Sequence, residues 1–311
     1  MTRKGMSDDM LYECAIIGGG PAGLSAALVL GRARRKTVVF DDDHARNRVT
    51  REAHGFLTRD GTKPSELRRL ARKEIAEYPS VEFQNEKIVS IERLDRAHYE
   101  LKTASGKVFR SVKILLANGL RDEQPNIPGI EHFYGTSLFS CPYCDGWELR
   151  DRPLAVIADK NVFKLAAEVY TWSRDVIVFT NGEGQLTAEE RKKLNAKEIR
   201  IVDDIIARLE GENGQLQSIR LEDGTLIDRT GGFVSPLWSH PNHFADALGC
   251  ERNQYGGILT DEYGRTTVWN VYAAGDVSHI VPSQLIIAAG TGSAAAIGMN
   301  GDLTNEFFDT I

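Results

Sequence analysis

Two cysteines near the middle of the chain have the spacing of a redox pair. The segment Cys141-Pro142-Tyr143-Cys144-Asp145-Gly146 places two thiols three positions apart. Such a pair can close a short disulfide, and each thiol lowers the pKa of the other, which suits reversible thiol exchange. Asp145 directly follows the second cysteine, and this position favours an acid that trades a proton with a leaving thiolate over a plain turn residue.

The same pair could instead form half of a structural zinc site. Zinc in such sites takes four ligands, but the sequence has no second Cys-x-x-Cys and no Cys/His pair at ligand spacing. Cys14 falls in an expected buried strand, Cys250 stands alone, and the 7 histidines are scattered. We therefore expect a redox pair and no metal.

A glycine-rich turn near the start of the chain is typical of a dinucleotide site. Gly18-x-Gly20-x-x-Gly23 lies between an expected strand at 12–17 and an expected helix at 21–35. In that context glycines permit a tight turn and a close approach to a pyrophosphate, while the helix N-terminus supplies N–H donors. Asp41, which ends the next strand at 37–40, stands near the position of a ribose-binding acid.

A second helix N-terminus follows a short strand late in the chain. Gly275-Asp276 comes after the strand at 271–273, and a long helix begins at about 284. A helix N-terminus suits a developing negative charge on a bound ring. His54 lies close in sequence to the first glycine site, and we expect it to touch a cofactor.

Composition excludes several classes of protein. The 311 residues carry 38 Lys+Arg against 44 Asp+Glu, a net charge of -6 that argues against a nucleic-acid-binding protein. No apolar run approaches the roughly 18 residues of a membrane span. The first ten residues lack the apolar core of a secretory signal. Four cysteines are too few for a disulfide scaffold. We expect a cytoplasmic protein of one or two domains, with no membrane or nucleic-acid partner.

The expected strands and helices follow the same order in two successive parts of the chain. The first set continues with a helix at 64–77, whose arginines are expected to be solvated, and an antiparallel meander at 81–116. A breaker-rich linker follows at 124–129. The second set has strands and helices at 154–158, 162–173, 175–180 and 187–197, then a meander to about 234. Thr187 and Glu190 predict a capping box for its last helix. The repetition suggests two related domains, one inserted in the other.

Three motifs together resemble the low-molecular-weight thioredoxin reductase family of flavoproteins. They are Ile17-Gly18-Gly19-Gly20-Pro21-Ala22-Gly23, Cys141-Pro142-Tyr143-Cys144-Asp145-Gly146 and Tyr272-Ala273-Ala274-Gly275-Asp276. The resemblance spans almost the whole chain. It implies an α/β fold of two Rossmann-like, three-layer nucleotide-binding domains. Residues 1–120 and 240–311 would form a discontinuous FAD-binding domain, and residues 121–239 an inserted domain that carries the redox pair. It also implies a homodimer.

The resemblance also implies roles for individual residues. Cys144 would face the flavin, Cys141 would exchange with the substrate, and Asp145 would be the acid/base. Non-covalent FAD would be bound at the glycine-rich turn, the acid of the second strand and the second helix N-terminus, through Gly18, Gly20, Pro21, Ala22, Gly23, Asp41, His54, Gly119, Gly275, Asp276, Gln284, Leu285 and Ile286.

The inserted domain departs from the family pattern at its nucleotide site. The strand at 154–157 is followed by Ala158-Asp159-Lys160-Asn161-Val162, without a glycine. Where the family usually has a His-Arg-Arg cluster for the 2′-phosphate of NADPH, this chain has Phe179-Thr180-Asn181-Gly182-Glu183-Gly184. The segment resembles a thioredoxin reductase-like subgroup with a degenerate NADPH site, some members of which take electrons from ferredoxin.

These inferences predict an FAD-dependent dithiol/disulfide oxidoreductase. It would pass electrons between flavin and an external disulfide, such as that of a thioredoxin-like protein, with a donor other than NADPH. One alternative is a small-molecule dithiol oxidase that uses oxygen, which the Cys-Pro-Tyr-Cys variant resembles; those proteins usually carry His where this chain has Asp145. A second alternative is a flavin-binding redox sensor without turnover.

Overall fold

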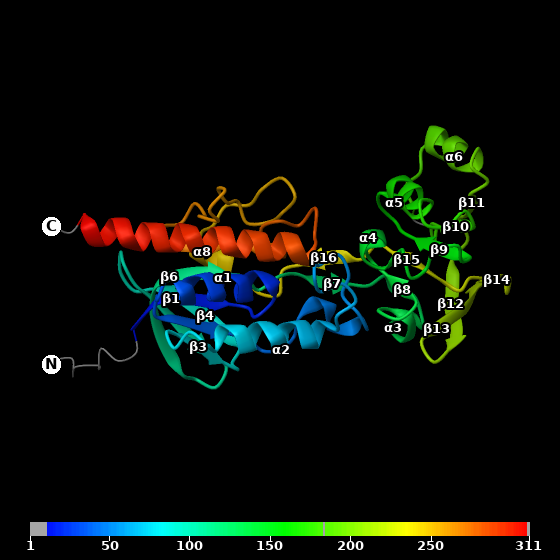
Figure 1. Cartoon of the computed structure of the whole chain (residues 1–311). Coiled ribbons are helices and arrows are strands. Elements are labelled where there is room, and N and C mark those ends of the chain that lie inside the picture. Colours follow the sequence, from blue (N-terminus) through cyan, green and yellow to red (C-terminus); the bar gives the residue numbers. More distant parts are fainter. Residues whose placement is uncertain (1–10, 183, 310–311) are drawn as a thin grey trace. The chain divides into compact units, whose positions relative to one another are not determined.

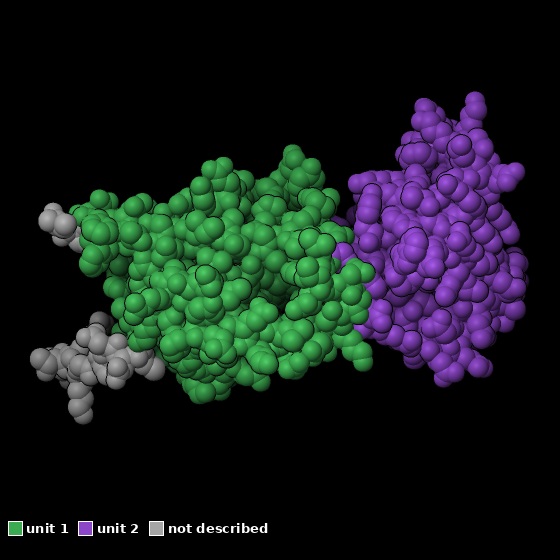
Figure 2. All heavy atoms as spheres, in the orientation of Figure 1, with its two compact units in different colours: residues 1–48, 56–121, 240–311 green, residues 49–55, 122–239 purple. Residues whose placement is uncertain are grey.

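The chain divides into two compact units. The computed structural model describes residues 11–182 and 184–309. Unit 1 comprises Met1–Arg48, Phe56–Arg121 and His240–Ile311, and unit 2 comprises Val49–Gly55 and Asp122–Ser239 (Figure 2). The expected boundaries at 120/121 and 239/240 differ from these by a residue or less. Residues 49–55, however, were expected in the FAD-binding domain, and they pack with unit 2 instead.

Unit 1 is built on a seven-stranded sheet. Its strand order is β3-β2-β1-β6-β5-β4, with β17 paired to β6. The strands are β1 (Leu11–Ile17), β2 (Thr37–Phe40), β3 (Val81–Gln84), β4 (Ile88–Arg93), β5 (Tyr99–Thr103), β6 (Val108–Leu116) and β17 (Val271–Ala273). Strands β1, β2 and β17 are parallel to their neighbours, so their carboxyl ends meet at one edge of the sheet.

The expected meander at 81–116 is only partly correct. Strands β4, β5 and β6 are antiparallel, but β3 leaves the meander and pairs parallel to β2 in the register Val38↔Glu82. Helix α2 (Pro64–Ile75) is the crossover that makes this parallel pairing possible. Sequence alternation alone does not distinguish pairing of β3 with β4 from pairing of β3 with β2, because either arrangement allows the same alternation along β3.

Helices and irregular segments cover the two faces of the unit 1 sheet. Cys14 and Ile16 of β1 pack under α1 (Pro21–Arg32) and α8 (Leu285–Phe308), which run side by side (Figure 1). Ala15 and Ile17 face the other side, with residues of β4, β5 and α7 (Phe244–Leu248). Alternation along β1 therefore buries both of its faces, as expected for a parallel strand between two layers.

Two glycines of α8 offer a matched test of the α1–α8 contact. A Cβ on Gly292 would stand 2.0 Å from the carbonyl oxygen of Ala22, whereas a Cβ on Gly290 would meet nothing within 4 Å. We expect Gly292→Ala to lower the free energy of unfolding by about 1–3 kcal/mol through overpacking. Gly290→Ala should raise it by roughly 0.5–1 kcal/mol, because alanine favours the helix. Thermal unfolding of the two variants checks this, and equal effects would contradict the packing shown.

Unit 2 contains a second parallel sheet and a smaller antiparallel one. The parallel sheet has the order β11-β10-β9-β15-β8 and the antiparallel sheet the order β12-β13-β14. The strands are β8 (Leu138–Phe139), β9 (Leu154–Ile157), β10 (Val176–Phe179), β11 (Arg200–Val202), β12 (Ile206–Glu212), β13 (Gln215–Leu221), β14 (Leu226–Asp228) and β15 (Gly231–Val234). The expected meander to 234 is therefore antiparallel only in β12–β14, since β11 and β15 join the parallel sheet.

Three layers form unit 2 as well. Leu154 and Val156 of β9 pack under α5 (Val162–Val169) and α6 (Ala188–Asn195). Ala155 and Ile157 face the antiparallel sheet and α3 (Ile130–Phe133). Both helices are shorter than expected. The capping box at the start of α6 is confirmed: Thr187 Oγ1 accepts from the Glu190 amide, and the Glu190 carboxylate accepts from the Thr187 amide.

Short elements complete the chain. Strands β7 (Arg121–Glu123) and β16 (Leu237–Ser239) pair with each other at two of the four places where the sequence passes between the units. The one-turn helix α4 (Pro142–Asp145) carries the second cysteine, and η2 (Arg46–Val49) and η3 (Gly275–Val277) are 3₁₀ turns. No helix in the described part of the chain is long and apolar enough to cross a membrane.

Candidate active site

The glycine-rich turn of unit 1 is packed too closely to accept side chains. Gly18 has φ +112, and a Cβ there would stand 2.3 Å from the carbonyl oxygen of Ala117 on the neighbouring strand connection. A Cβ on Gly23 would stand 1.9 Å from the carbonyl oxygen of Gly18, which lets the first turn of α1 sit directly on the loop. The turn therefore brings the helix N-terminus close to the carboxyl end of β1.

The N-terminus of α1 has no side chain or acidic residue that would compete with a pyrophosphate. Gly20 is the N-cap of α1, no side chain caps it, Pro21 starts the helix with Ala22 behind it, and the first turn has no acidic residue. A Cβ on Gly20 would meet nothing within 4 Å. Helix N–H groups without side-chain partners and open space beside them are what an anionic cofactor needs.

Asp41 is placed at the carboxyl end of β2, as a ribose-binding acid would be. Its carboxylate is only 9% exposed and accepts a hydrogen bond from Arg72 of α2. Arg68, one helical turn earlier, donates to Asp43 at 2.7 Å. The expected solvated face of α2 is therefore wrong for these two arginines. Arg68 and Arg72 are four residues apart, and Ile75 follows on the same face of the helix. This spacing could have indicated that the two arginines face the rest of the unit.

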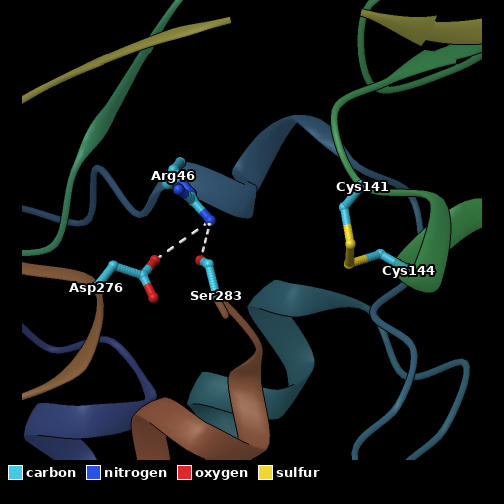
Figure 3. Close-up of a disulfide and its surroundings, with 5 residues drawn as sticks. All are labelled: Arg46, Cys141, Cys144, Asp276 and Ser283. Carbon is cyan, nitrogen blue, oxygen red and sulfur yellow. Dashed lines mark hydrogen bonds and ion pairs between the residues drawn. A yellow bond between two sulfur atoms is a disulfide. The ribbon is translucent and has the colours of Figure 1, made fainter. Parts of the chain in front are cut away.

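The second helix N-terminus of unit 1 is bordered by an ion pair. Arg46 Nη2 lies 3.3 Å from Oδ2 of Asp276 in η3. The same nitrogen donates a hydrogen bond to Ser283 Oγ at 2.7 Å (Figure 3). Gln284 is the N-cap of α8, and Leu285 and Ile286 form its first turn. Sequence reasoning missed Arg46, which is the first residue of the 3₁₀ turn η2 and meets Asp276 and Ser283 only in the folded chain.

Two further predicted glycines lie at the same edge of the sheet. Gly119 follows β6 with φ +63 and has open space around its Cβ position. Gly275 has φ +75 and donates its N–H to Thr291 Oγ1 at 3.0 Å. Unit 1 thus gathers every predicted cofactor residue except His54.

The cysteine pair forms a disulfide at the start of α4. Cys141 is the N-cap and Cys144 lies in the single turn that follows, with the two Cα atoms 5.3 Å apart (Figure 3). The amides of Cys144 and Asp145 both donate to the carbonyl of Cys141, at 3.1 and 3.2 Å. Both cysteines are partly exposed. The pair is therefore held in a fixed turn within reach of a partner.

Aromatic side chains surround this turn. The rings of Tyr143 and Trp172 meet edge to face with centroids 5.5 Å apart, and a Cβ on Gly146 would stand 2.7 Å from the indole of Trp172. Trp147, 65% exposed, is covered on one face by the guanidinium of Arg150 at 4.1 Å. Trp172 thus supports the redox turn from behind, while Tyr143 and Trp147 offer apolar surface beside it.

Asp145, the residue that follows Cys144, is buried. It is 8% exposed. The pKa of Asp145 is raised to about 7, chiefly by burial; the charge of His54 opposes this rise and that of Glu148 adds to it. A carboxylic acid with a pKa near neutrality can both give and take a proton at physiological pH, which suits acid–base catalysis.

His54 lies beside Asp145 in unit 2. The segment 49–55 comes close to the backbone of unit 2 at Gly135: a Cβ on Gly135 would stand 2.5 Å from the carbonyl oxygen of Val49. His54 Nε2 is 3.7 Å from Glu148 Oε1. Within its own unit, His54 therefore belongs with the redox turn. The cofactor contact expected for His54 stays a prediction.

Comparison with known proteins decides the family. The family model described as pyridine nucleotide-disulphide oxidoreductase matches residues 12–292. The chain belongs to this family. Thioredoxin reductase aclD of Aspergillus oryzae is 32% identical over 306 residues, which cover 94% of this chain and 96% of that protein.

Two solved structures of similar proteins cover nearly all of this pyridine nucleotide-disulphide oxidoreductase. The putative thioredoxin reductase TrxB from Bacillus anthracis is 42% identical with a TM-score of 0.92, over 95% of this chain and 99% of that one. The structure of HlmI is 34% identical with a TM-score of 0.93, over 99% and 97%. The fold, two Rossmann-like α/β units, is thereby confirmed.

Family membership also establishes the type of enzyme. This pyridine nucleotide-disulphide oxidoreductase is a flavin-dependent disulfide oxidoreductase of the thioredoxin reductase-like type, with FAD as its cofactor. When bound, FAD supplies two-electron redox chemistry. The open space at Gly20 and the uncapped N-terminus of α1 agree with this cofactor. Among the described residues no cluster of three or more His, Cys, Asp or Glu could hold a metal ion.

Proposed function

We propose that the enzyme passes electrons between FAD and an external disulfide, such as that of a thioredoxin-like protein, through the Cys141–Cys144 pair. The observation that carries this proposal is a partly exposed disulfide followed directly in the chain by a buried acid, Asp145. Exposed Tyr143 and Trp147 flank the pair and offer a partner apolar surface. Relatives named thioredoxin reductase support a substrate of this class.

We further propose that the electron donor is not NADPH but another carrier, such as ferredoxin. Four residues with side chains connect β9 to α5. The last of them, Asn161, adopts a left-handed conformation with φ 51 at the N-cap, where its side chain makes no capping hydrogen bond. A pyrophosphate at a helix N-terminus requires the backbone to come close. The side chains of Asp159, Lys160 and Asn161 stand in the positions where glycines would leave room.

The residues after β10 also disfavour NADPH. Asp203 accepts from Thr180 Oγ1 at 2.8 Å and binds Arg191 through two hydrogen bonds of 2.8 and 2.9 Å. Arg191 is thus already engaged by a carboxylate, although bidentate arginine contacts are the usual way to bind a 2′-phosphate. Glu183, the acid in the predicted specificity segment, lies outside the described residues.

Anaerobic mixing tests the donor. We expect excess NADPH or NADH to bleach the flavin of the purified enzyme slowly or not at all, because the phosphate turn and the specificity segment both lack the groups that bind them. Reduced ferredoxin, or a chemical reductant as a control, should bleach it fast. Absorbance near the flavin maximum is the measurement. Rapid, stoichiometric bleaching by either nucleotide would contradict this proposal and leave the disulfide chemistry untouched.

A small-molecule dithiol oxidase is a second candidate, and the altered β9–α5 turn favours it too. An oxidase needs no nucleotide donor, since the substrate dithiol provides two electrons and two protons and oxygen takes them up to give peroxide. Oxygen-dependent peroxide formation with small dithiols, together with no reduction of any thioredoxin by the photoreduced enzyme, would select this candidate. Reduction of a thioredoxin without peroxide would select the first.

A further inference from the structure

Three ionisable side chains from two distant parts of the sequence meet behind the redox turn of unit 2. Asp145 and Glu148 lie on or just after α4, and His54 comes from the separate segment 49–55. Sequence reasoning gave His54 and Asp145 unrelated roles and did not single out Glu148. The fold brings His54 within 3.7 Å of Glu148, which follows the buried Asp145 by three residues, and the charges of both influence the pKa of Asp145.

The cluster is partly shielded from water. The side chain of His54 is 15% exposed, and its Nε2 lies 3.7 Å from Glu148 Oε1 on one side and 3.7 Å from Glu52 Oε2 on the other. The second carboxylate oxygen of Glu148 is buried and has no hydrogen-bond partner. Glu52 is more open to solvent, with 56% of its side chain exposed. The imidazole thus lies near two carboxylates that both reach solvent, those of Glu148, whose side chain is 38% exposed, and Glu52.

We propose that His54 and Glu148 form a proton relay between Asp145 and solvent, with His54 as the carrier and Glu148 as the group that positions it. This inference rests on the proposed acid/base role of Asp145. Histidine suits such a path because it gains and loses a proton near neutral pH. The carboxylate of Glu148, 3.7 Å from the imidazole Nε2, would hold the ring in place.

The relay balances the reaction of the disulfide. Reduction breaks the Cys141–Cys144 bond and converts it into two thiols, which takes two electrons and two protons. FAD in its reduced form, when bound, would supply both electrons and one of the protons. Asp145 gives the second proton to the leaving sulfur and regains one from His54, which regains one from water. In the oxidising direction each transfer is reversed, and the released proton leaves by the same path.

A simple structural role for the His54–Glu148 pair makes different predictions. A pair that only anchors the segment 49–55 would affect stability when broken, without moving the pKa of Asp145 in a defined direction. The relay requires electrostatic contact between all members. The groups that face Asp145 are His54 and Glu148, and those that face His54 are Glu148 and Glu52. Their charges predict shifts of opposite sign.

The first measurement is the titration of Asp145 in the full-length FAD enzyme with its disulfide intact. Aspartate labelled with ¹³C at the side-chain carboxyl is followed by NMR, and Asp145→Asn assigns the signal. We expect His54→Gln to raise the pKa of Asp145, because it removes a cation, and Glu148→Gln to lower it, because it removes an anion. Glu131→Gln should leave it unchanged, since Glu131 lies 3.5 Å from His132 in an exposed pair of the same kind.

The second measurement is the rate of disulfide exchange with and without added imidazole. His54→Ala should slow turnover by up to about 10²-fold, the lower end of what a general acid–base group contributes, and free imidazole should restore part of the rate. Opposite shifts of the Asp145 titration with imidazole rescue support the relay. Shifts of equal sign, no shift, or no rescue would overturn it. The titration requires no turnover, so it remains decisive even if the proposed substrate class is wrong.

Discussion

Replacing either cysteine of the Cys141–Cys144 pair with serine is expected to abolish disulfide turnover, because a single thiol cannot complete the exchange. The two variants should differ in colour. In Cys141→Ser the Cys144 thiol has no disulfide partner, and if Cys144 is the flavin-facing cysteine its thiolate will give a long-wavelength charge-transfer band. Cys144→Ser should lack that band. Absorbance spectra of both variants with FAD bound are the measurement.

The two buried cysteines provide the control. Cys14 and Cys250 are buried, and burial raises the pKa of both thiols, so neither is a ready nucleophile. Cys250→Ser should keep the wild-type rate and spectrum. A charge-transfer band in Cys144→Ser instead of Cys141→Ser would reverse the assignment of inner and outer cysteine. Substantial turnover in either variant would refute the proposed exchange.

Asp145→Asn is expected to slow turnover by about 10²–10⁴-fold, the usual contribution of general acid–base catalysis. Asparagine keeps the size and burial of the side chain but cannot give up a proton. The rate of dithiol–disulfide exchange, measured across pH, checks this. Asp151→Asn is a matched control, since Asp151 is exposed in the same unit. An unchanged rate in Asp145→Asn would return this residue to the role of a turn former.

The same substitution should change how stability depends on pH. The pKa of Asp145 rises from its ordinary value of 3.8 to about 7 on folding. Its stabilising contribution is therefore complete below about pH 4 and is lost as the pH rises to about 7. Asparagine has no such loss. At about 1.4 kcal/mol per pKa unit, the variant should gain a few kcal/mol over wild type between pH 4 and pH 8. Thermal unfolding at both pH values tests this, and parallel behaviour would contradict it.

Local rules made much of the fold predictable. The order strand, glycine turn, helix and strand around Gly18 needs only hydrophobic runs and a steric requirement for glycine, and both are visible in sequence. The capping box at Thr187 and Glu190 is equally local. The pairing of β3 with β2 depended instead on where α2 crosses the sheet, a choice that the alternation of residues 81–84 does not encode.

Residues whose role depends on distant partners could not be predicted. Lys113, in the middle of β6, is fully buried and is neutralised by Glu306 of α8 at 2.7 Å, with Asn270 accepting a second hydrogen bond at 2.6 Å. Its partners lie more than 150 residues away in sequence. Arg46 and Glu148 were missed for the same reason. His54 was singled out, but its neighbours were not, because the change of unit after Arg48 leaves no mark in the composition.

The placement of Val49–Gly55 in unit 2 means that the polypeptide passes between the units four times, at 48/49, 55/56, 121/122 and 239/240. A domain inserted at a single point would need only two such passages. A hybrid enzyme made by exchanging residues 122–239 with those of a relative would thus combine a foreign redox turn with the native His54. Transplanting the module intact requires two separate pieces of the gene, and a fragment that starts at residue 122 lacks the segment 49–55 with its buried Ala53.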